Sequence, residues 1–243
     1  MGARGLSLRE AVDLTRTGDV WLFRGRSGAD RAIQTLTNSP VNHVGMAVVL
    51  DDLPPLMWHA ELGRSLTDLW TGTRQRGVQL HDLHDAVVVW NRRYGQRAWL
   101  RQLDRPVTLE MEDAVLRSIA RLDGTPFPTT ARLAGRWFGG RVPKVRTLPS
   151  LRARPDGGQQ PADPATELDT VYCAEVVALT YEAMGLVAGG KRPSWYDPGR
   201  FWSGDDLDLV GGYSLGGEIP VEVPADAVPS DPTVLRPDKE RRP

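Results

Sequence analysis

The chain has 243 residues, 40% of them hydrophobic, and its 30 Lys and Arg residues nearly balance 31 Asp and Glu residues. This length can bury one sizeable core, so we expect a single domain over residues 1–218. A net charge of −1 argues against a nucleic-acid-binding protein and against attraction to anionic membranes.

The N-terminal residues lack the apolar segment of a signal peptide, and no stretch approaches the roughly 18 apolar residues that a membrane span needs. We therefore expect no integral membrane association. One cysteine, Cys173, excludes an intrachain disulfide and suits a reducing compartment, so a cytoplasmic location is predicted. The sequence does not indicate an oligomeric state.

The N-terminal third predicts three elements in turn. Residues 7–14 begin with Ser7 and carry Glu10 three positions later, which is the capping-box pattern of a helix start. Residues 19–23 then predict a strand, and residues 28–36 have helical spacing.

A β-hairpin is predicted next, from apolar residues 43–50 and 56–62 on either side of a loop rich in Asp and Pro. A loop centred on residue 52 or 53 puts His43 opposite residue 61 or 63. Glu61 is then a direct or diagonal neighbour of His43 on the same face. This inference depends on register, because a slip of one residue turns Glu61 to the other face.

Residues 78–83 and 86–90 predict two more strands, and the second is apolar enough to be buried on both faces. Residues 108–122 have helical spacing. Residues 139–168 are rich in Gly, Pro and Arg and predict an insertion or mobile loop.

An amphipathic helix is predicted to begin at Cys173 and to end just before Gly185, because glycine is favoured at the position that follows a helix. From Ile219 the chain is rich in Pro, Asp and Arg and shows no periodicity. We expect residues 219–243 to form a disordered or surface-bound tail.

Cys173 is the leading candidate for chemistry. A lone cysteine is more often a small apolar core residue, but the first turn of a helix offers free backbone N–H groups and the positive end of the helix dipole. These favour a thiolate and can hold an oxyanion.

His43 is the candidate base that would take the thiol proton, with Glu61 orienting its ring. Taken singly, His43 could be an ordinary strand histidine and Glu61 a solvated edge residue; the two together favour the functional interpretation. His59 shares the face of Glu61 by strand alternation and is a weaker substitute for either role. His81 and His84 form a short motif that could suggest a metal, but closed zinc sites usually need four ligands, so neither a metal nor a cofactor is expected.

The order of these three residues resembles that of the circularly permuted NlpC-type papain-like hydrolases, the YiiX-like group. The matching segments are Gly18-Asp19-Val20, Asn42-His43-Val44-Gly45-Met46, Ala60-Glu61, Gly124-Thr125-Pro126-Phe127 and Tyr172-Cys173-Ala174-Glu175-Val176-Val177.

The resemblance implies an α+β fold in which a central antiparallel sheet packs against the cysteine helix. It also implies Cys173 as nucleophile, His43 as base and acid, Glu61 as the orienting residue and Tyr172 as a helper at the oxyanion site. The expected substrate is a small molecule, a peptide or an acyl compound. The relatives include amidases, peptidases and lipid acyltransferases, so fold and triad leave the acyl donor open.

Three functions follow as alternatives. The first is a cysteine hydrolase that cleaves an amide or ester bond through a thioester acyl-enzyme. The second is acyl transfer to an amine or a lipid, against which the lack of a basic amphipathic helix argues mildly. The third is a papain-like module that binds a ligand without catalysis.

Overall fold

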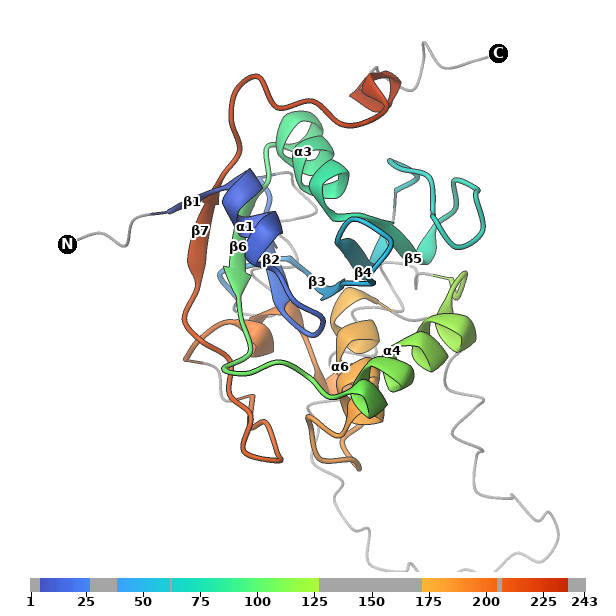
Figure 1. Ribbon diagram of the computed structural model, residues 1–243, viewed down its shortest axis with the longest axis vertical. Helices are drawn as coiled ribbons and strands as arrows, with labels where there is room; N and C mark the ends of the chain where they lie inside the picture. Colours follow the sequence, from blue (N-terminus) through green and yellow to red (C-terminus); the bar gives the residue numbers. More distant parts are fainter. Residues whose placement is uncertain (1–4, 27–38, 62, 127–171, 205–206, 236–243) are drawn as a thin grey trace, which may run out of the picture.

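A computed structural model describes most of the chain (Figure 1). The described residues are 5–26, 39–61, 63–126, 172–204 and 207–235. The helix predicted at residues 28–36 and the insertion predicted at 139–168 lie outside them. Within the described residues, one sheet is covered by helices on both faces, so the expected α+β class is confirmed.

The sheet has seven strands among the described residues, in the order β1-β7-β6-β2-β3-β4-β5. Their bounds are β1 Leu6–Ser7, β2 Val20–Arg24, β3 His43–Val48, β4 Leu56–Glu61, β5 Gly77–Asp82, β6 Arg97–Arg101 and β7 Ile219–Glu222. All neighbouring strands pair antiparallel except β1 and β7, which are parallel. The expected central antiparallel sheet is therefore present.

Helices lie on the two faces of this sheet. On one face are α1 (Leu8–Leu14) and α3 (Leu83–Tyr94), and on the other are α4 (Leu109–Leu122) and α6 (Cys173–Met184). Short 3-10 helices follow: η2 Pro193–Trp195, η3 Pro198–Phe201 and η4 Pro232–Leu235.

Strand alternation divides the core in two. Val44 and Trp58 belong to the cluster that includes Cys173 on α6, whereas Phe23 and Met57 belong to the cluster that includes Trp90 on α3. We call these two sides of the sheet the α6 face and the α3 face. Because side chains alternate along a strand, His43 and His59 lie on the α3 face.

Several predicted elements are confirmed where local sequence signals were strong. The capping box forms at α1, and the predicted hairpin is β3 and β4. The helix that begins at Cys173 ends as predicted, with Gly185 in the left-handed region at φ 74°.

The strand predicted at residues 86–90 is wrong, because these residues lie within α3. The Asp82 side chain caps this helix by accepting a hydrogen bond from the Asp85 N–H at 2.8 Å. Its apolar run from Ala86 to Trp90 is buried against the sheet on one side and the C-terminal segment on the other. A short run that is apolar throughout has no period that separates a strand from a buried helix.

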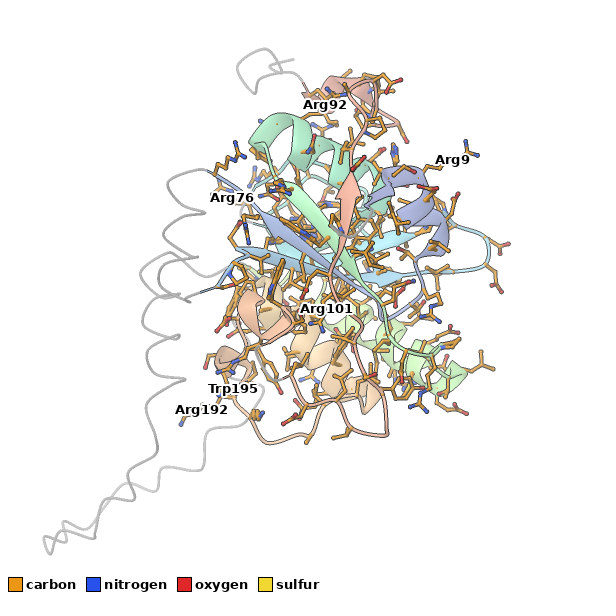
Figure 2. All side chains as sticks on the ribbon, turned by 90° about the vertical axis from the view of Figure 1, so that its left-hand side faces the viewer. Arg9, Arg76, Arg92, Arg101, Arg192 and Trp195 are labelled. Carbon is orange, nitrogen blue, oxygen red and sulfur yellow. The ribbon has the colours of Figure 1, made fainter. Side chains whose placement is uncertain are left out.

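The segment after Ile219 also differs from expectation, since Ile219–Glu222 form β7 instead of part of a tail. Arg101 of β6, labelled in Figure 2, holds the segment that precedes β7. Its guanidinium donates to the carbonyls of Gly216 at 2.7 Å and Leu215 at 3.2 Å and lies 3.7 Å from the Glu218 carboxylate. These contacts come from residues far apart in the chain, so a four-residue strand that contains Pro220 carried no sequence signal.

A search of the described helices finds none that combines the length and the apolar character needed to cross a membrane.

Candidate functional site

Cys173 is the first residue of α6, and its side chain is packed into the core of the α6 face. Its exposed fraction is 4%. Burial raises the pKa of the thiol to about 12, and a backbone hydrogen bond from Val44 acts in the opposite direction. The thiol is therefore neutral at neutral pH, and its sulfur lies against the backbone of the residue that follows His43.

The backbone at this end of α6 is held by a capping box. Glu175 is fully buried, and its carboxylate accepts a hydrogen bond from the Tyr172 N–H at 3.1 Å. The next N–H groups, those of Cys173 and Ala174, fall in the first turn, where an α-helix has no internal acceptor. Both N–H groups lower the pKa of the Cys173 thiol, as expected for donors that face the sulfur.

The strands β3 and β4 pair only over part of their length in the described structure. Their pairs run from Val48 with Leu56 to Met46 with Trp58. The same register, continued, puts His43 opposite Glu61, the first of the two registers predicted from the loop. The described backbone pairing stops before that point. Beyond it, the two strands are connected by the contact between the His43 and His59 side chains.

Gly45 permits this close approach. A Cβ atom at this position would overlap the sulfur of Met57 and lie 3.4 Å from the Cβ of His59. A larger residue there would have to displace the Met57 side chain, which packs against Gly45 at this point.

Three histidines and a glutamine form a continuous hydrogen-bonded row on the α3 face, which we call the imidazole chain. His43 Nε2 lies 3.2 Å from His59 Nδ1, His59 Nε2 lies 3.0 Å from His81 Nδ1, and His81 Nε2 lies 3.1 Å from Gln79 Oε1. The Trp90 ring packs edge-on against His43 and His59, with centroid distances of 5.0 and 4.8 Å. Both ring nitrogens of His59 and of His81 are thus in use.

The amide of Gln79 sets the direction of the protons in this chain. Its Nε2 donates to the carbonyl of Gly77 at 3.3 Å, which turns Oε1 toward His81. An oxygen can only accept, so His81 carries its proton on Nε2, and His59 must then donate from Nε2 to His81. His43 in turn donates from Nε2 to His59, which leaves the lone pair of neutral His43 on Nδ1.

The three rings are neutral in the folded protein. Burial lowers the pKa of His43 to about 3, with a smaller contribution from His81. It lowers the pKa of His81 to about 4, against the attraction of Asp68, and lowers that of His59 as well. Desolvation disfavours the charged imidazolium in each case.

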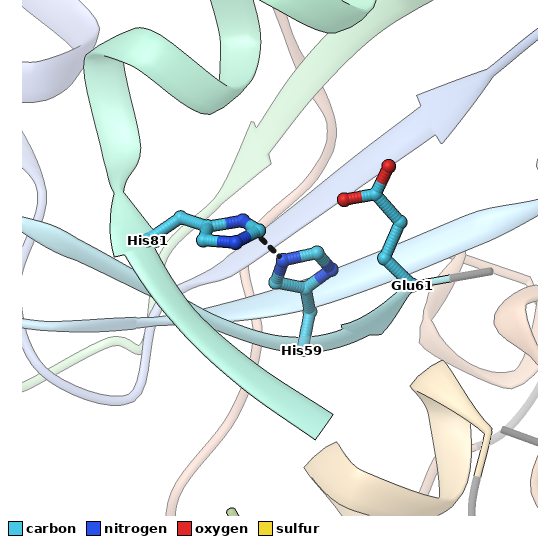
Figure 3. Close-up of side chains that lie close together, drawn as sticks. All are labelled: His59, Glu61 and His81. Carbon is cyan, nitrogen blue, oxygen red and sulfur yellow. Dashed lines mark hydrogen bonds between the residues drawn. The ribbon is translucent and has the colours of Figure 1, made fainter. Parts of the chain in front are cut away.

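Glu61 ends β4 beside this chain without a described hydrogen bond to His43. Its carboxylate accepts a hydrogen bond from the Ser65 hydroxyl at 2.9 Å, and burial raises its pKa to about 7. Ligand atoms of Glu61, His59 and His81 all lie within 4.8 Å of one another (Figure 3).

The residues predicted as a triad are thus only partly together in the described structure. His43 and Glu61 share the α3 face, and His59 is the residue within hydrogen-bonding distance of His43. Cys173 belongs to the α6 face, and the described contacts of the His43 ring, with Phe23, His59 and Trp90, do not include it.

Sequence reasoning gave His59 only a secondary role and assigned no role to Gln79. His59 carried a usable signal, because it shares a strand face with Glu61. Gln79 carried a weaker one, because it alternates with His81 on the strand predicted at residues 78–83, whereas its place opposite His59 depends on the pairing of β4 with β5.

The chain was compared with known proteins. No family model matches it, and no curated protein matches it. Among solved structures, it is similar to the crystal structure of the metalloprotein yiiX from Escherichia coli O157:H7, DUF1105, at 17% identity and a TM-score of 0.48, over 86% of this chain and 99% of that chain. A likeness of this extent assigns no activity and no ligand.

Proposed function

We propose that the protein is a cysteine hydrolase that cleaves an amide or ester bond, with Cys173 as nucleophile and His43 as general base. The observation that carries the proposal is the position of the Cys173 thiol in the first turn of α6, where the Val44 backbone lowers its pKa. The thiol at the start of α6 thus lies beside the residue that follows His43, in the part of β3 where the pairing with β4 has stopped.

The proton order of the imidazole chain supports the role of His43. Its Nε2 donates to His59, so the basic lone pair is on Nδ1, the ring nitrogen nearer the backbone. The ring itself lies on the α3 face, so a change of the His43 side-chain torsions on substrate binding is part of the proposal. Geometry in a resting site often tightens only when substrate is bound.

We assign the orienting role to His59 in place of Glu61. His59 Nδ1 accepts a hydrogen bond from His43 Nε2 at 3.2 Å, whereas the Glu61 carboxylate accepts one from the Ser65 hydroxyl. A neutral imidazole that is itself held by His81 and Gln79 can fix the tautomer of His43, as a carboxylate does in a serine protease triad.

The reaction follows from these positions. Because thiol and imidazole are both neutral at rest, His43 Nδ1 takes the thiol proton as the Cys173 sulfur attacks the carbonyl carbon. The N–H groups of Cys173 and Ala174 stabilise the oxyanion, and Tyr172 is the further candidate there. His43 then donates its proton to the leaving amine or alcohol, and water releases the acyl group with His43 again as base.

The experiment is intact-protein mass spectrometry after exposure to peptide, acyl-thioester and lipid ester substrates. Cys173 is the only cysteine, so an added acyl mass that is lost in Cys173→Ala names both the site and the donor. His43→Ala should slow acylation about 100-fold or more, the usual contribution of a general base. The control is His84→Ala, which removes a histidine outside the imidazole chain and should leave the rate unchanged.

The outcomes separate the alternatives. Release of the acyl group to an added amine or alcohol in preference to water would make the protein an acyltransferase of the same chemistry. The absence of acylation with every substrate class, or an equal rate in His43→Ala, would favour a binding module without catalysis.

A further inference from the structure

His59, Glu61 and His81 lie close together on the α3 face, with the two imidazoles in contact and the Glu61 carboxylate turned away from them (Figure 3). Each offers one ligand atom, and these atoms all lie within 4.8 Å of one another. We propose that these three residues bind a divalent transition metal ion such as Zn²⁺, and that its binding reverses the proton order of the imidazole chain. The consequence for catalysis rests on the proposed function; the metal site itself does not.

The spacing of the two imidazole nitrogens is close to that of two ligands on a shared cation. His59 Nε2 and His81 Nδ1 are 3.0 Å apart. Two nitrogens that bind one tetrahedral Zn²⁺ at about 2.0–2.1 Å stand roughly 3.3 Å apart, so a small opening of the pair admits the ion. The Glu61 carboxylate must turn toward it from Ser65, which completes three protein ligands and leaves a fourth position open.

The donor set favours zinc over magnesium or calcium. Two imidazole nitrogens and one carboxylate suit Zn²⁺, Co²⁺ or Ni²⁺, whereas Mg²⁺ and Ca²⁺ prefer an all-oxygen shell. Charge is also compensated, since Glu61 is a ligand and the buried carboxylate of Asp68 acts on His81 from nearby. His59 and His81 are fully buried while Glu61 is partly exposed, so the ion enters at the Glu61 side.

The outer partners are those that metal-binding histidines require. A ligating imidazole usually donates its other N–H to an oxygen or to another acceptor, which fixes its orientation. His81 donates from Nε2 to Gln79 Oε1, and this bond is unchanged when Nδ1 binds a metal. His59 can donate from Nδ1 to His43 Nε2 across the same 3.2 Å.

Metal binding then changes which ring nitrogen of His43 carries the proton. Without metal, His59 carries its proton on Nε2 and His43 carries its own on Nε2, so Nδ1 of His43 is basic. A metal on His59 Nε2 moves the His59 proton to Nδ1, where it is donated to His43 Nε2. Neutral His43 must then hold its proton on Nδ1, and it cannot accept one from Cys173. The occupied site therefore holds the base in its inactive tautomer.

A second cluster, Asp82, His84 and Asp85, also offers three ligand atoms within the same distance of one another. Its carboxylates are already engaged, because Asp82 caps α3 and Asp85 accepts hydrogen bonds from the Ser230 N–H at 2.9 and 3.1 Å. It provides the matched control, since it lies next to the proposed site in sequence and shares its residue types.

The binding test uses the full chain without an affinity tag, with Zn²⁺ for calorimetry and Co²⁺ for its visible absorption. We expect one ion per chain in the wild type and in His84→Ala, and at least a tenfold loss of affinity in His81→Ala and in Glu61→Gln. Glu61→Gln is nearly isosteric, so it remains informative if His81→Ala unfolds. No binding by the wild type, unchanged affinity in Glu61→Gln, or loss of binding in His84→Ala would overturn the site.

The proton test uses nitrogen-15 NMR of the imidazole rings, which distinguishes a protonated Nδ1 from a protonated Nε2. We expect the proton of His43 to be on Nε2 without metal and on Nδ1 with Zn²⁺, and Cys173→Ala should show the same change. A His43 proton that stays on Nε2 with metal bound refutes the reversal. Neither measurement needs a substrate, so a failed acylation experiment rejects the proposed function and leaves the metal result standing.

Discussion

Gln79→Leu tests whether the imidazole chain is held from its far end. Gln79 is fully buried and makes two hydrogen bonds, accepting from His81 Nε2 and donating to the Gly77 carbonyl. Leu has a similar volume and makes neither. Each buried polar group left without a partner costs about 1–3 kcal/mol, so we expect the free energy of unfolding to fall by about 2–4 kcal/mol.

The measurement is urea unfolding, with thermal unfolding as a second probe. For a chain of this size, that loss lowers the melting temperature by roughly 4–16 °C. The control is Gln102→Leu, which also removes two hydrogen bonds, but at a half-buried position and from an Asp19 oxygen that still accepts from the Arg16 N–H. Its loss should stay below about 1 kcal/mol. Equal losses in the two variants would refute the reasoning that the chain depends on a buried, fully satisfied amide.

Three further predictions concern single positions. Gly77→Ala should lower the free energy of unfolding by more than Gly72→Ala does. Gly77 has a φ of 110° and an added Cβ would overlap the Thr125 carbonyl oxygen, whereas a Cβ added at Gly72, φ 69°, has no atom within 4 Å. Urea unfolding compares the two variants, and equal losses would contradict the clash. Asp82→Ala should cost about 0.5–2 kcal/mol through the lost cap of α3, measured in the same way, and no change would contradict the capping role. The rate of Cys173 alkylation by iodoacetamide should keep rising about tenfold per pH unit from pH 7 to beyond 9, because a raised thiol pKa leaves less thiolate at each pH than an exposed cysteine has; a plateau below pH 9 would show a lowered pKa instead.

Local signals in the sequence were sufficient for several elements. Ser7 with Glu10 predicted the capping box of α1, and Gly185 predicted the end of α6, because caps act over three or four residues. The register of β3 with β4 could be narrowed to two choices from the loop between them, and the structure adopts one of these.

Other elements depend on partners that are distant in the chain. Residues 86–90 form a helix because of what covers them, and β7 exists because β6 and β1 lie on its two sides. The hydrophobic pattern of four or five residues predicts neither of these packing arrangements.

The candidate site divides along the same line. The residue types, the position of Cys173 at a helix start and the shared face of His43 and Glu61 were determined by the sequence alone, since each follows from spacing within one element or one hairpin. The choice of His59 as the partner of His43, the row through His81 to Gln79, and the placement of thiol and imidazole on opposite faces were decided only by the tertiary structure. These depend on where β4 leaves β3, on its register with β5 and on the packing of Trp90, which are contacts between segments that no local pattern relates.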